Sequence, residues 1–518
     1  MDAQSRRLSR RHLLKKGAIS IVSATTVAGT LETLAFLPQR VALAAPAITS
    51  LPEIQFDLGN FIPPAQTFND GGGSVLLRFG PVYTLFLTMK LTRLPSKTDS
   101  QSLNDALARI ESVYPFSPSG VFTIVSYGLP YFRRLPSSLV KAHMPRLLKD
   151  QSRFALEEAV ASPTDVAPQN PAIQKQTFNV PVVIENNDVL ITLRSDKLSN
   201  TQDVANWLQG SNSLGGFSLP SPSFNGLFTF TSSRVMFQQI GLPRKVANQF
   251  NLSFASKVNP DSPMWMGFAD QQVNGSGPAS IVTFQGNSSA KFASLPDGYF
   301  TNGSIQHLSH VIQDLGEFYA STGPNPEPFT ERVQYMFRSD PIPSLGNPDQ
   351  FANGGGPAYF DNNAKTFLKF KGQGTTEAVQ TAANPNVVND PEPDGSGRKP
   401  RMGHLPALQQ SSRAADGTPV HIRMDGPGFD SMDVPDGSNQ PKLQFTIFVP
   451  TADFFATMRK NQAALKYQAF QQGRGGSTTG TVDSDDNGLE RFLTATRRQN
   501  FLVPPRSRRA FPLREFLH

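Results

Sequence analysis

Residues 82–91 read VYTLFLTMKL, a run of apolar and β-branched side chains between a proline and the SKTDS turn at residues 96–100. Such a run with turn-forming residues at both ends predicts a β-strand. Residues 102–113, SLNDALARIESV, carry apolar side chains at helical spacing and predict an α-helix. A second strand is expected at residues 121–127, VFTIVSY.

The same order begins again further along the chain. Residues 188–194, DVLITLR, predict a strand, and residues 201–209, TQDVANWLQ, predict a short helix. Strand, helix, strand, then strand and helix is typical of a ferredoxin-like unit, in which helices cover one face of an antiparallel sheet. The first half of the chain is therefore expected to be an α+β unit.

The second half repeats this order more loosely. Its long stretch of Gly, Pro and Asn before residue 403 predicts surface loops. We expect an α+β fold of two ferredoxin-like halves with helices on the outer faces, divided into domains at 46–278 and 279–518. The elements expected in the second half are strands at 280–284, 303–313 and 442–449, and helices at 330–338 and 451–467, the last capped by Thr451.

Length and composition fit a folded, loop-rich protein of enzyme size. The chain has 518 residues, of which 38% are hydrophobic and 17% charged, so two domains are expected. It contains no cysteine. This excludes disulfides, thiol nucleophiles, cysteine-ligated iron–sulfur clusters and thiolate-ligated haem.

The basic charge is concentrated at the two ends of the chain. The net charge is +7, of which residues 1–45 contribute +5 and residues 491–518 contribute +6, which leaves residues 46–490 at −4. A nucleic-acid-binding domain would instead carry a basic face interleaved with aromatic residues. We therefore expect no nucleic-acid partner.

The first 45 residues have the pattern of a twin-arginine export signal. Residues 9–15 read SRRHLLK, a moderately apolar run follows at residues 17–37, and Ala42–Ala44 resembles a signal-peptidase site. Thr and Glu residues interrupt the apolar run, so an anchoring transmembrane helix is the less favoured interpretation. We predict a signal peptide at 1–45, contact with the twin-arginine translocase, and a periplasmic or extracellular protein.

One later stretch combines a candidate metal ligand with a candidate cation. His404 lies between Gly403 and Pro406, and Arg423 follows nineteen residues later, after the turn at residues 416–417. A neutral imidazole is a good axial ligand for haem iron, and a guanidinium group is well suited to stabilise charge on a bound peroxide.

A second motif precedes this stretch. Gly267, Asp270 and Asn274 lie within GFADQQVN, which resembles the GxxDGxxNP signature of the dye-decolourising peroxidases. The interval from His404 to Arg423 is similar to that family's pattern as well. This resemblance implies two ferredoxin-like halves around a haem b.

The resemblance also implies roles for three residues. His404 would be the proximal iron ligand, Asp270 the distal acid–base group and Arg423 the distal cation, and hydrogen peroxide and an organic reductant would be the substrates. Gln271 and Asp425 depart from the family pattern. A non-catalytic haem-binding protein and an exported protein of this fold without haem therefore remain alternatives, and a homo-oligomer stays open.

Other candidate ligands receive simpler interpretations. His421 would share a strand face with Arg423, so the two could not serve opposite faces of a haem. His307 and His310 would point to opposite faces of a strand, which favours packing over a metal site with Asp314. Residues 483–488, DSDDNG, lack the glutamate that a calcium loop needs and are expected to form a turn.

The C-terminal segment is the last feature. Residues 501–505, FLVPP, are similar to the segment that closes the family's fold. Pairing with haem propionates or with a partner is one interpretation of the arginines around it, and a solvated basic tail is the favoured one for most of them. These arginines are Arg497, Arg498, Arg506, Arg508 and Arg509.

Overall fold

The computed structural model describes six parts of the chain. They are residues 29–35, 50–162, 165–266, 279–320, 421–458 and 492–517, except for gaps at 63–65, 70–73, 78–79, 168–174, 176, 223, 225, 259, 261, 287–292 and 456–457.

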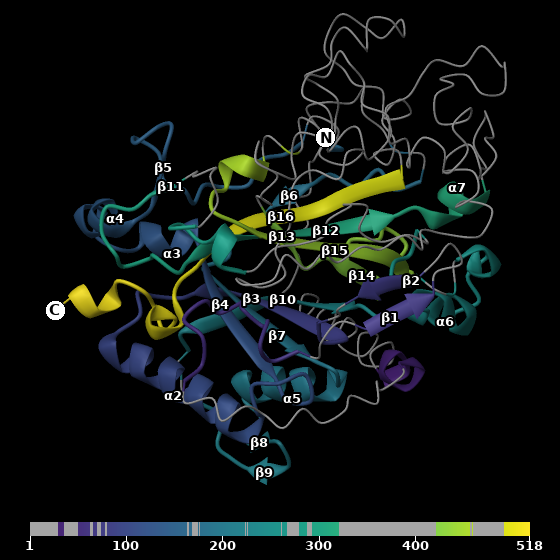
Figure 1. The fold of residues 1–518 in the computed structure, drawn as a ribbon, viewed down its shortest axis with the longest axis horizontal. Coiled ribbons are helices and arrows are strands. Elements are labelled where there is room, and N and C mark those ends of the chain that lie inside the picture. The colour runs from purple at the N-terminus through teal and green to yellow at the C-terminus, as the bar shows by residue number, and fades with distance from the viewer. Residues whose placement is uncertain are drawn as a thin grey trace, which may run out of the picture.

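The described residues form a mixed α+β fold built on one ten-stranded sheet (Figure 1). Eight strands follow one another across it in the order β10-β3-β7-β4-β16-β12-β15-β13, while β14 also pairs with β15 and β6 with β16. The strands are β3 (Tyr83–Leu91), β4 (Phe122–Gly128), β6 (Val183–Ile184), β7 (Val189–Ser195), β10 (Phe228–Phe237), β12 (Ser304–Gln313), β13 (Ile422–Arg423), β14 (Gly426–Asp430), β15 (Gln440–Val449) and β16 (Leu493–Val503).

The N-terminal half of the sheet has the ferredoxin-like order. Strands β3 and β4 are both antiparallel to β7, so they run parallel to each other with β7 between them. Helix α2 (Lys97–Val113) connects β3 to β4, and α5 (Leu198–Leu208) connects β7 to β10. This is the split βαβ arrangement that the sequence predicted.

The C-terminal half repeats that order. Strand β12 lies between β16 and β15, both antiparallel to it, and β15 lies between β12 and the pair β13 and β14. Helix α7 (Leu315–Ala320) follows β12. A second helix begins at Asp453, whose backbone N–H donates to the Thr451 hydroxyl at 3.2 Å. The predicted cap at Thr451 is thus confirmed, whereas the exact domain boundary at residue 278 stays a prediction.

The two halves meet at two places. In the middle of the sheet β4 and β16 pair at Gly128–Phe501 and Tyr127–Leu502. At its ends β14 approaches β10 so closely that a Cβ atom added at Gly428 would lie 3.0 Å from the Val235 carbonyl oxygen. The sheet therefore curls until its two ends touch, and we call the β10–β14 contact the seam.

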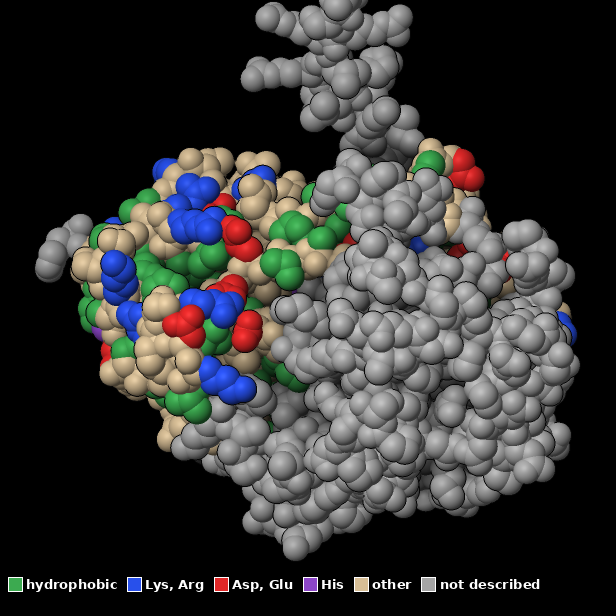
Figure 2. All heavy atoms as spheres, turned by 90° about the horizontal axis from the view of Figure 1, so that it is seen from above, with side chains coloured by type: hydrophobic (Ala, Val, Ile, Leu, Met, Phe, Trp, Pro, Cys, Tyr) green, Lys and Arg blue, Asp and Glu red, His purple; other side chains and the backbone are tan. Residues whose placement is uncertain are grey.

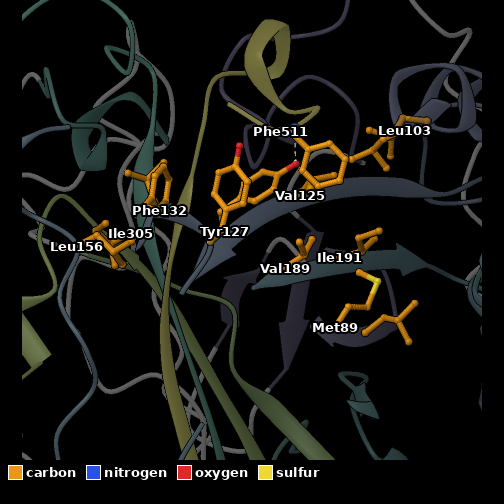
Figure 3. Close-up of a cluster of buried hydrophobic side chains, with 14 of the residues drawn as sticks. Met89, Leu103, Val125, Tyr127, Phe132, Leu156, Val189, Ile191, Ile305 and Phe511 are labelled. Carbon is orange, nitrogen blue, oxygen red and sulfur yellow. Dashed lines mark hydrogen bonds between the residues drawn. The ribbon is translucent and has the colours of Figure 1, made fainter. Parts of the chain in front are cut away.

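The three largest clusters of buried side chains described in the structure pack against the sheet. The outer cluster lies under α2 and α5 and continues across both halves (Figure 3). The interior cluster fills the inside of the curl, and the side cluster lies around Tyr83 and Trp265. Representative members are Leu87, Leu107, Tyr127 and Ile447 of the outer cluster, Phe86, Leu190, Met424 and Phe448 of the interior cluster, and Leu31, Val246 and Phe429 of the side cluster.

Helix α2 begins five residues earlier than its apolar periodicity predicted. The Asp99 backbone N–H donates to the Ser96 hydroxyl at 3.1 Å, and the Asp99 carboxylate accepts from the Ser96 backbone N–H at 2.6 Å. These reciprocal bonds form a capping box, which satisfies the unpaired donors of the first turn. The residues predicted as a turn are therefore the first turn of the helix.

The remaining elements are short and lie around the sheet. They are β1 (Gln66–Asn69), β2 (Ser74–Leu77), α3 (Leu129–Arg133), α4 (Ser137–His143), β5 (Arg146–Leu147), β8 (Ser213–Leu214), β9 (Phe217–Ser218), α6 (Leu242–Gln249), η1 (Ala255–Lys257), η2 (Ala279–Val282), β11 (Ala293–Ser294), η6 (Arg506–Arg508) and η7 (Arg514–Phe516).

Most of the predicted strands are confirmed, and one is wrong. The strands expected at 82–91, 121–127, 188–194, 303–313 and 442–449 are β3, β4, β7, β12 and β15. The strand expected at 280–284 is instead the 3₁₀ turn η2, in which the Thr283 hydroxyl donates to the Ser280 carbonyl at 3.0 Å. The helix expected at 330–338 lies outside the described residues, and β10 and β16 were not predicted.

Part of the predicted signal segment is described. Residues 29–34 are helical, and Leu31 is buried in the side cluster. The Tyr83 hydroxyl donates to the Leu31 carbonyl at 2.7 Å, and the Lys245 ammonium group donates to the Leu34 carbonyl at 3.3 Å. Within the described parts of the chain, no helix has both the length and the apolar character to cross a membrane.

Candidate functional site

Only one of the three predicted site residues lies within the described residues. Arg423 is the second residue of β13, while Asp270 and His404 fall in the stretches 267–278 and 321–420 that the structure does not describe. The predicted roles of Asp270 and His404, and the placement of an iron between them, thus stay predictions. The geometry around Arg423 can be built from its neighbours.

Arg423 lies on the outer face of the C-terminal half-sheet. Ile422 and Met424 pack with the interior cluster, so the residue between them points to the opposite side of the strand. On that side Arg423 pairs in register with Ile447, a member of the outer cluster. The side chain of Arg423 is half-buried. A guanidinium group is thus held at the edge of an apolar surface.

His421 lies on the same face as Arg423. Its ring centroid is 5.6 Å from that of Phe454, which belongs to the outer cluster. The expectation that these two side chains share a face is therefore confirmed. Asp425, the departure from the family pattern, is half-buried two residues after Arg423.

The chain just before the Asp270 motif is fastened to the strand just after Arg423. Trp265 is fully buried, and its indole N–H donates to the Gly428 carbonyl at 3.0 Å. The Tyr319 hydroxyl donates to the Trp265 carbonyl at 2.8 Å. Trp265 precedes Asp270 by five residues in the sequence.

The two histidines of β12 point in opposite directions, as predicted. The His307 ring stacks on Phe455 of the outer cluster, with centroids 4.1 Å apart. Its Nδ1 and Nε2 atoms lie 2.7 Å from Asn500 Oδ1 and 2.6 Å from Ser309 Oγ. His310 instead faces the inside of the curl, where Nδ1 lies 2.9 Å from Thr496 Oγ1. The predicted opposite directions of the two rings are therefore confirmed.

Sequence reasoning missed a group of charged side chains inside the curl. Arg234 is fully buried, and its Nη2 atom donates to both carboxylate oxygens of Glu185 at 2.5 Å. Arg497 binds both oxygens of Asp433 at 2.7 Å. We call this group the ionic cluster. Its members are Glu185, Arg234, His310, Asp430, Asp433, Lys442 and Arg497.

The ionic cluster changes the protonation equilibria of its members. Burial by itself raises the pKa of Asp433, but hydrogen bonds from His310 and Arg497 outweigh it and hold that pKa well below its ordinary value. Burial lowers the pKa of Lys442, and the charges of Asp430 and Asp433 offset part of this effect. A charged residue inside an otherwise buried strand, such as Lys442 in β15, is the signal that could have revealed the cluster.

The C-terminal arginines are not a solvated tail. Arg498 forms a buried ion pair with Asp165, and Arg509 binds both oxygens of Glu111. Arg506 donates to the same Glu111 at 2.8 Å. The favoured interpretation as a solvated tail is therefore wrong for these three residues, because each guanidinium group meets a carboxylate of the chain itself. Figure 2 shows basic and acidic side chains next to one another on the described part of one face.

No cluster of three or more His, Asp or Glu side chains that could hold a metal ion occurs among the described residues. The DSDDNG segment at 483–488 lies outside them.

Comparison with protein families gives one match. Residues 152–343 match the model of a family of unknown function, DUF7405, which is less than half of the chain. No curated protein matches the sequence.

Solved structures of similar fold were found at low sequence identity. A variant of DypB from Rhodococcus jostii, in complex with heme, is 13% identical with a TM-score of 0.44, covering 87% of this chain and 96% of that chain. The encapsulated DyP-type peroxidase from Mycobacterium smegmatis is 13% identical with a TM-score of 0.42, covering 83% and 96%. The dye-decolorizing protein from V. cholerae is 13% identical with a TM-score of 0.40, covering 88% and 98%.

Proposed function

We propose that this chain is a peroxidase that binds haem b through His404 and uses hydrogen peroxide to oxidise organic substrates. Asp270 and Arg423 are its distal acid–base group and distal cation. The motifs around Asp270 and His404 support this function. The contacts of described residues next to these motifs support it as well.

The observation that carries the proposal is the hydrogen bond between Trp265 and Gly428, at 3.0 Å. It joins the segment leading into the Asp270 motif to the strand that begins three residues after Arg423. A distal carboxylate and a distal guanidinium must lie near each other to act on one peroxide molecule. The bond supports this because it holds Trp265, which precedes Asp270 by five residues, against the strand that follows Arg423.

The surroundings of Arg423 are apolar. Ile447, its partner in register, and Phe454, which contacts His421, are buried, with 0% and 8% of their surfaces exposed. Peroxide reduction develops negative charge on oxygen. A guanidinium group in apolar surroundings is suited to stabilise that charge.

Bound haem would supply a redox-active iron that accepts oxidising equivalents from peroxide. His404 would hold it by an imidazole nitrogen. The Asp270 carboxylate would take the proton from one peroxide oxygen and return it to the other, which is general acid–base catalysis. Arg423, which keeps its charge at all physiological pH values, would stabilise the departing oxygen.

We further propose that the protein is exported through the twin-arginine translocase to the periplasm or beyond. The SRRHLLK sequence at residues 9–15 supports this. This route carries folded proteins, which suits a protein that receives its cofactor in the cytoplasm.

Absorption spectroscopy of protein expressed with a haem supply tests the proposal. The full chain is expected to show a Soret band, and His404→Ala is expected to abolish it. Because His421 lies on the face of Arg423, His421→Ala is the matched control and is expected to keep the band. Normal haem binding by the His404 variant would contradict the assignment.

Stopped-flow mixing with peroxide then separates the alternatives. Asp270→Asn is expected to keep haem but slow the reaction by about 10²-fold or more, the usual contribution of an acid–base group. Haem binding with no reaction in the unmodified chain would select a non-catalytic haem-binding protein. Absence of a Soret band in haem-supplied protein would select a protein of this fold without haem.

A further inference from the structure

A pocket of about 340 Å³ lies near the C-terminal end of the chain, away from β13 and β14. Four segments that are distant in sequence line it: the loop at Glu53, the end of α4 at His143, the loop before β12 at residues 297–302, and residues between 505 and 516 that follow β16. Its size falls in the range of small-molecule sites, about 300–1,000 Å³. The residues used below are Glu53, His143, Asp297, Tyr299, Arg508 and Phe516.

Aromatic rings form one part of the pocket. The His143 ring stacks on Phe516 with centroids 4.7 Å apart and an angle of 12° between the planes. Tyr299 is fixed behind them, because its hydroxyl accepts from the Leu513 N–H at 2.7 Å and donates to Glu515 at 2.8 Å. Phe516 is 46% exposed, so an aromatic edge stays available to a ligand.

The pocket already holds one internal cation against an aromatic ring. The Arg508 guanidinium carbon lies 4.9 Å from the centroid of Tyr299. Such cation–π contacts arise because the face of an aromatic ring carries partial negative charge. Arg508 also donates to Glu515 at 3.2 Å, so its charge is balanced within the chain.

The acidic side chains of the pocket outnumber its permanent cations. Glu53 and Asp297 line it together with Arg508 and His143. Asp297 is engaged by His143, whose Nδ1 lies 2.5 Å from its carboxylate. Glu53 accepts from the Ser507 N–H and hydroxyl at 3.2 and 2.8 Å through Oε2 alone, and its Oε1 has no hydrogen bond to any described residue. One carboxylate oxygen thus stays available beside the aromatic wall.

We propose that this pocket binds a small organic cation that carries an aromatic ring, with its ammonium group at Glu53 and its ring against Phe516. The carboxylate of Glu53 attracts a positive charge, and the exposed edge of Phe516 favours contact with a flat apolar group. The site goes beyond the proposed peroxidase function and shares no residue with it. Its success or failure therefore does not depend on haem.

Isothermal titration of the full chain with three matched probes tests this proposal. Phenethylammonium has both the charge and the ring, 3-phenylpropionate has the ring with the opposite charge, and butylammonium has the charge without the ring. Saturable binding is expected for phenethylammonium alone, at concentrations up to about 10 mM. Equal binding of 3-phenylpropionate, or no saturation by phenethylammonium, would overturn the proposal.

Two substitutions place the binding in this pocket. Glu53→Gln and Phe516→Ala are each expected to weaken phenethylammonium binding about two- to five-fold, the usual size of one exposed charge pair or cation–π contact. Both side chains are exposed, so only a small decrease in melting temperature is expected from the lost contacts with His143 and Ser507. Glu158→Gln is the control, because that exposed carboxylate pairs with Arg133 outside the pocket. Unchanged affinity in both pocket variants would show that the cation binds elsewhere.

Discussion

The two halves of the sheet share one strand order, but two regions inside the curl differ in what they bury. In one region, between β3 and β10, the Thr88 hydroxyl lies 2.7 Å from that of Thr231 and 2.6 Å from that of Ser232. The other region is the ionic cluster, to which both halves contribute: Arg234 lies in β10, whereas His310 and Lys442 lie in β12 and β15. One region therefore satisfies its polar groups with neutral hydroxyls and the other with charges.

This difference changes what each region tolerates. A neutral hydrogen bond contributes about 1 kcal/mol, so losing one among the hydroxyls of Thr88, Thr231 and Ser232 is a local event. A buried ion pair is costly to desolvate and is compensated only while both partners are present. The ionic cluster should therefore be the more sensitive of the two regions to single substitutions.

The largest effect is expected from Glu185→Ala. The side chains of Arg234 and Glu185 are 0% and 6% exposed, so the substitution leaves a buried guanidinium group without its carboxylate. The free energy of unfolding should fall by about 3–5 kcal/mol in urea denaturation. Glu158→Ala, which removes an exposed pair with Arg133, is the control and should cost about 0–1 kcal/mol.

If Glu185→Ala lowers the free energy of unfolding no more than its control does, the charges of the ionic cluster behave as solvated charges and the proposed difference between the two regions is wrong. The double variant Glu185→Leu with Arg234→Met gives a stricter test. Replacing both partners with apolar side chains of similar size should recover most of the lost stability.

A smaller effect is expected at the seam between the halves. In Gly428→Ala the new Cβ atom would lie 3.0 Å from the Val235 oxygen and 3.2 Å from the Lys442 Cβ atom. Such overpacking should lower the free energy of unfolding by about 1–3 kcal/mol, measured in the same denaturation assay. Gly316→Ala in α7, where the nearest atom is 3.6 Å away, should be neutral or stabilising. Equal effects at both glycines would argue against a closed seam.

The N-terminal half offers a local test in Ser96→Ala. The substitution removes the hydroxyl that caps α2 and should cost about 1 kcal/mol. Hydrogen exchange should speed up in the first turn of α2 and stay unchanged in β12 and β15. Thr98→Ala is the control, because Thr98 is exposed and lies two residues after Ser96 in the first turn of α2. Faster exchange in the C-terminal half would mean that the halves do not respond separately.

The smallest effect is a pH dependence at the same cap. A hydrogen bond from Arg93 lowers the pKa of Asp99 to about 2. A carboxyl group with a lowered native pKa stabilises the fold above its unfolded pKa of about 4 and loses this contribution as the pH falls through its native value.

Asp99→Asn should therefore flatten the loss of the free energy of unfolding between pH 4 and pH 2, by at most about 1 kcal/mol because Arg93 is exposed. Asp105→Asn on the exposed face of α2 is the control. If Asp99→Asn and the unmodified protein lose the same stability between pH 4 and pH 2, the lowered pKa of Asp99 is contradicted.

The sequence predicted best the strands that are buried along their whole length. β4 and β7 are buried at every residue, so their apolar runs identify them directly. β10 alternates exposed and buried positions, and β16 contains Arg497 and Arg498 in its middle. Their charges are compensated by Asp433 and Asp165, which are distant in sequence, so no local pattern shows that these arginines belong in a strand.

Two misplaced elements have local causes. The capping box at Ser96 and Asp99 was visible in the sequence, yet polar residues before an apolar run also form turns. The apolar run around Ile281 was too short to distinguish a strand from a single buried turn. Of the candidate site, the strand face of Arg423 followed from alternation alone, whereas the interior charges depend on contacts between distant segments.

The burial of Leu31 bears on the maturation of the chain. Cleavage of the signal peptide at Ala44 would remove Leu31. Tyr83 would then lose the side chain that covers it and the carbonyl oxygen that accepts a hydrogen bond from its hydroxyl. The processed protein would then expose to water an apolar patch that the precursor buries, and it would also be smaller. A dye that fluoresces on such surfaces would distinguish the two forms.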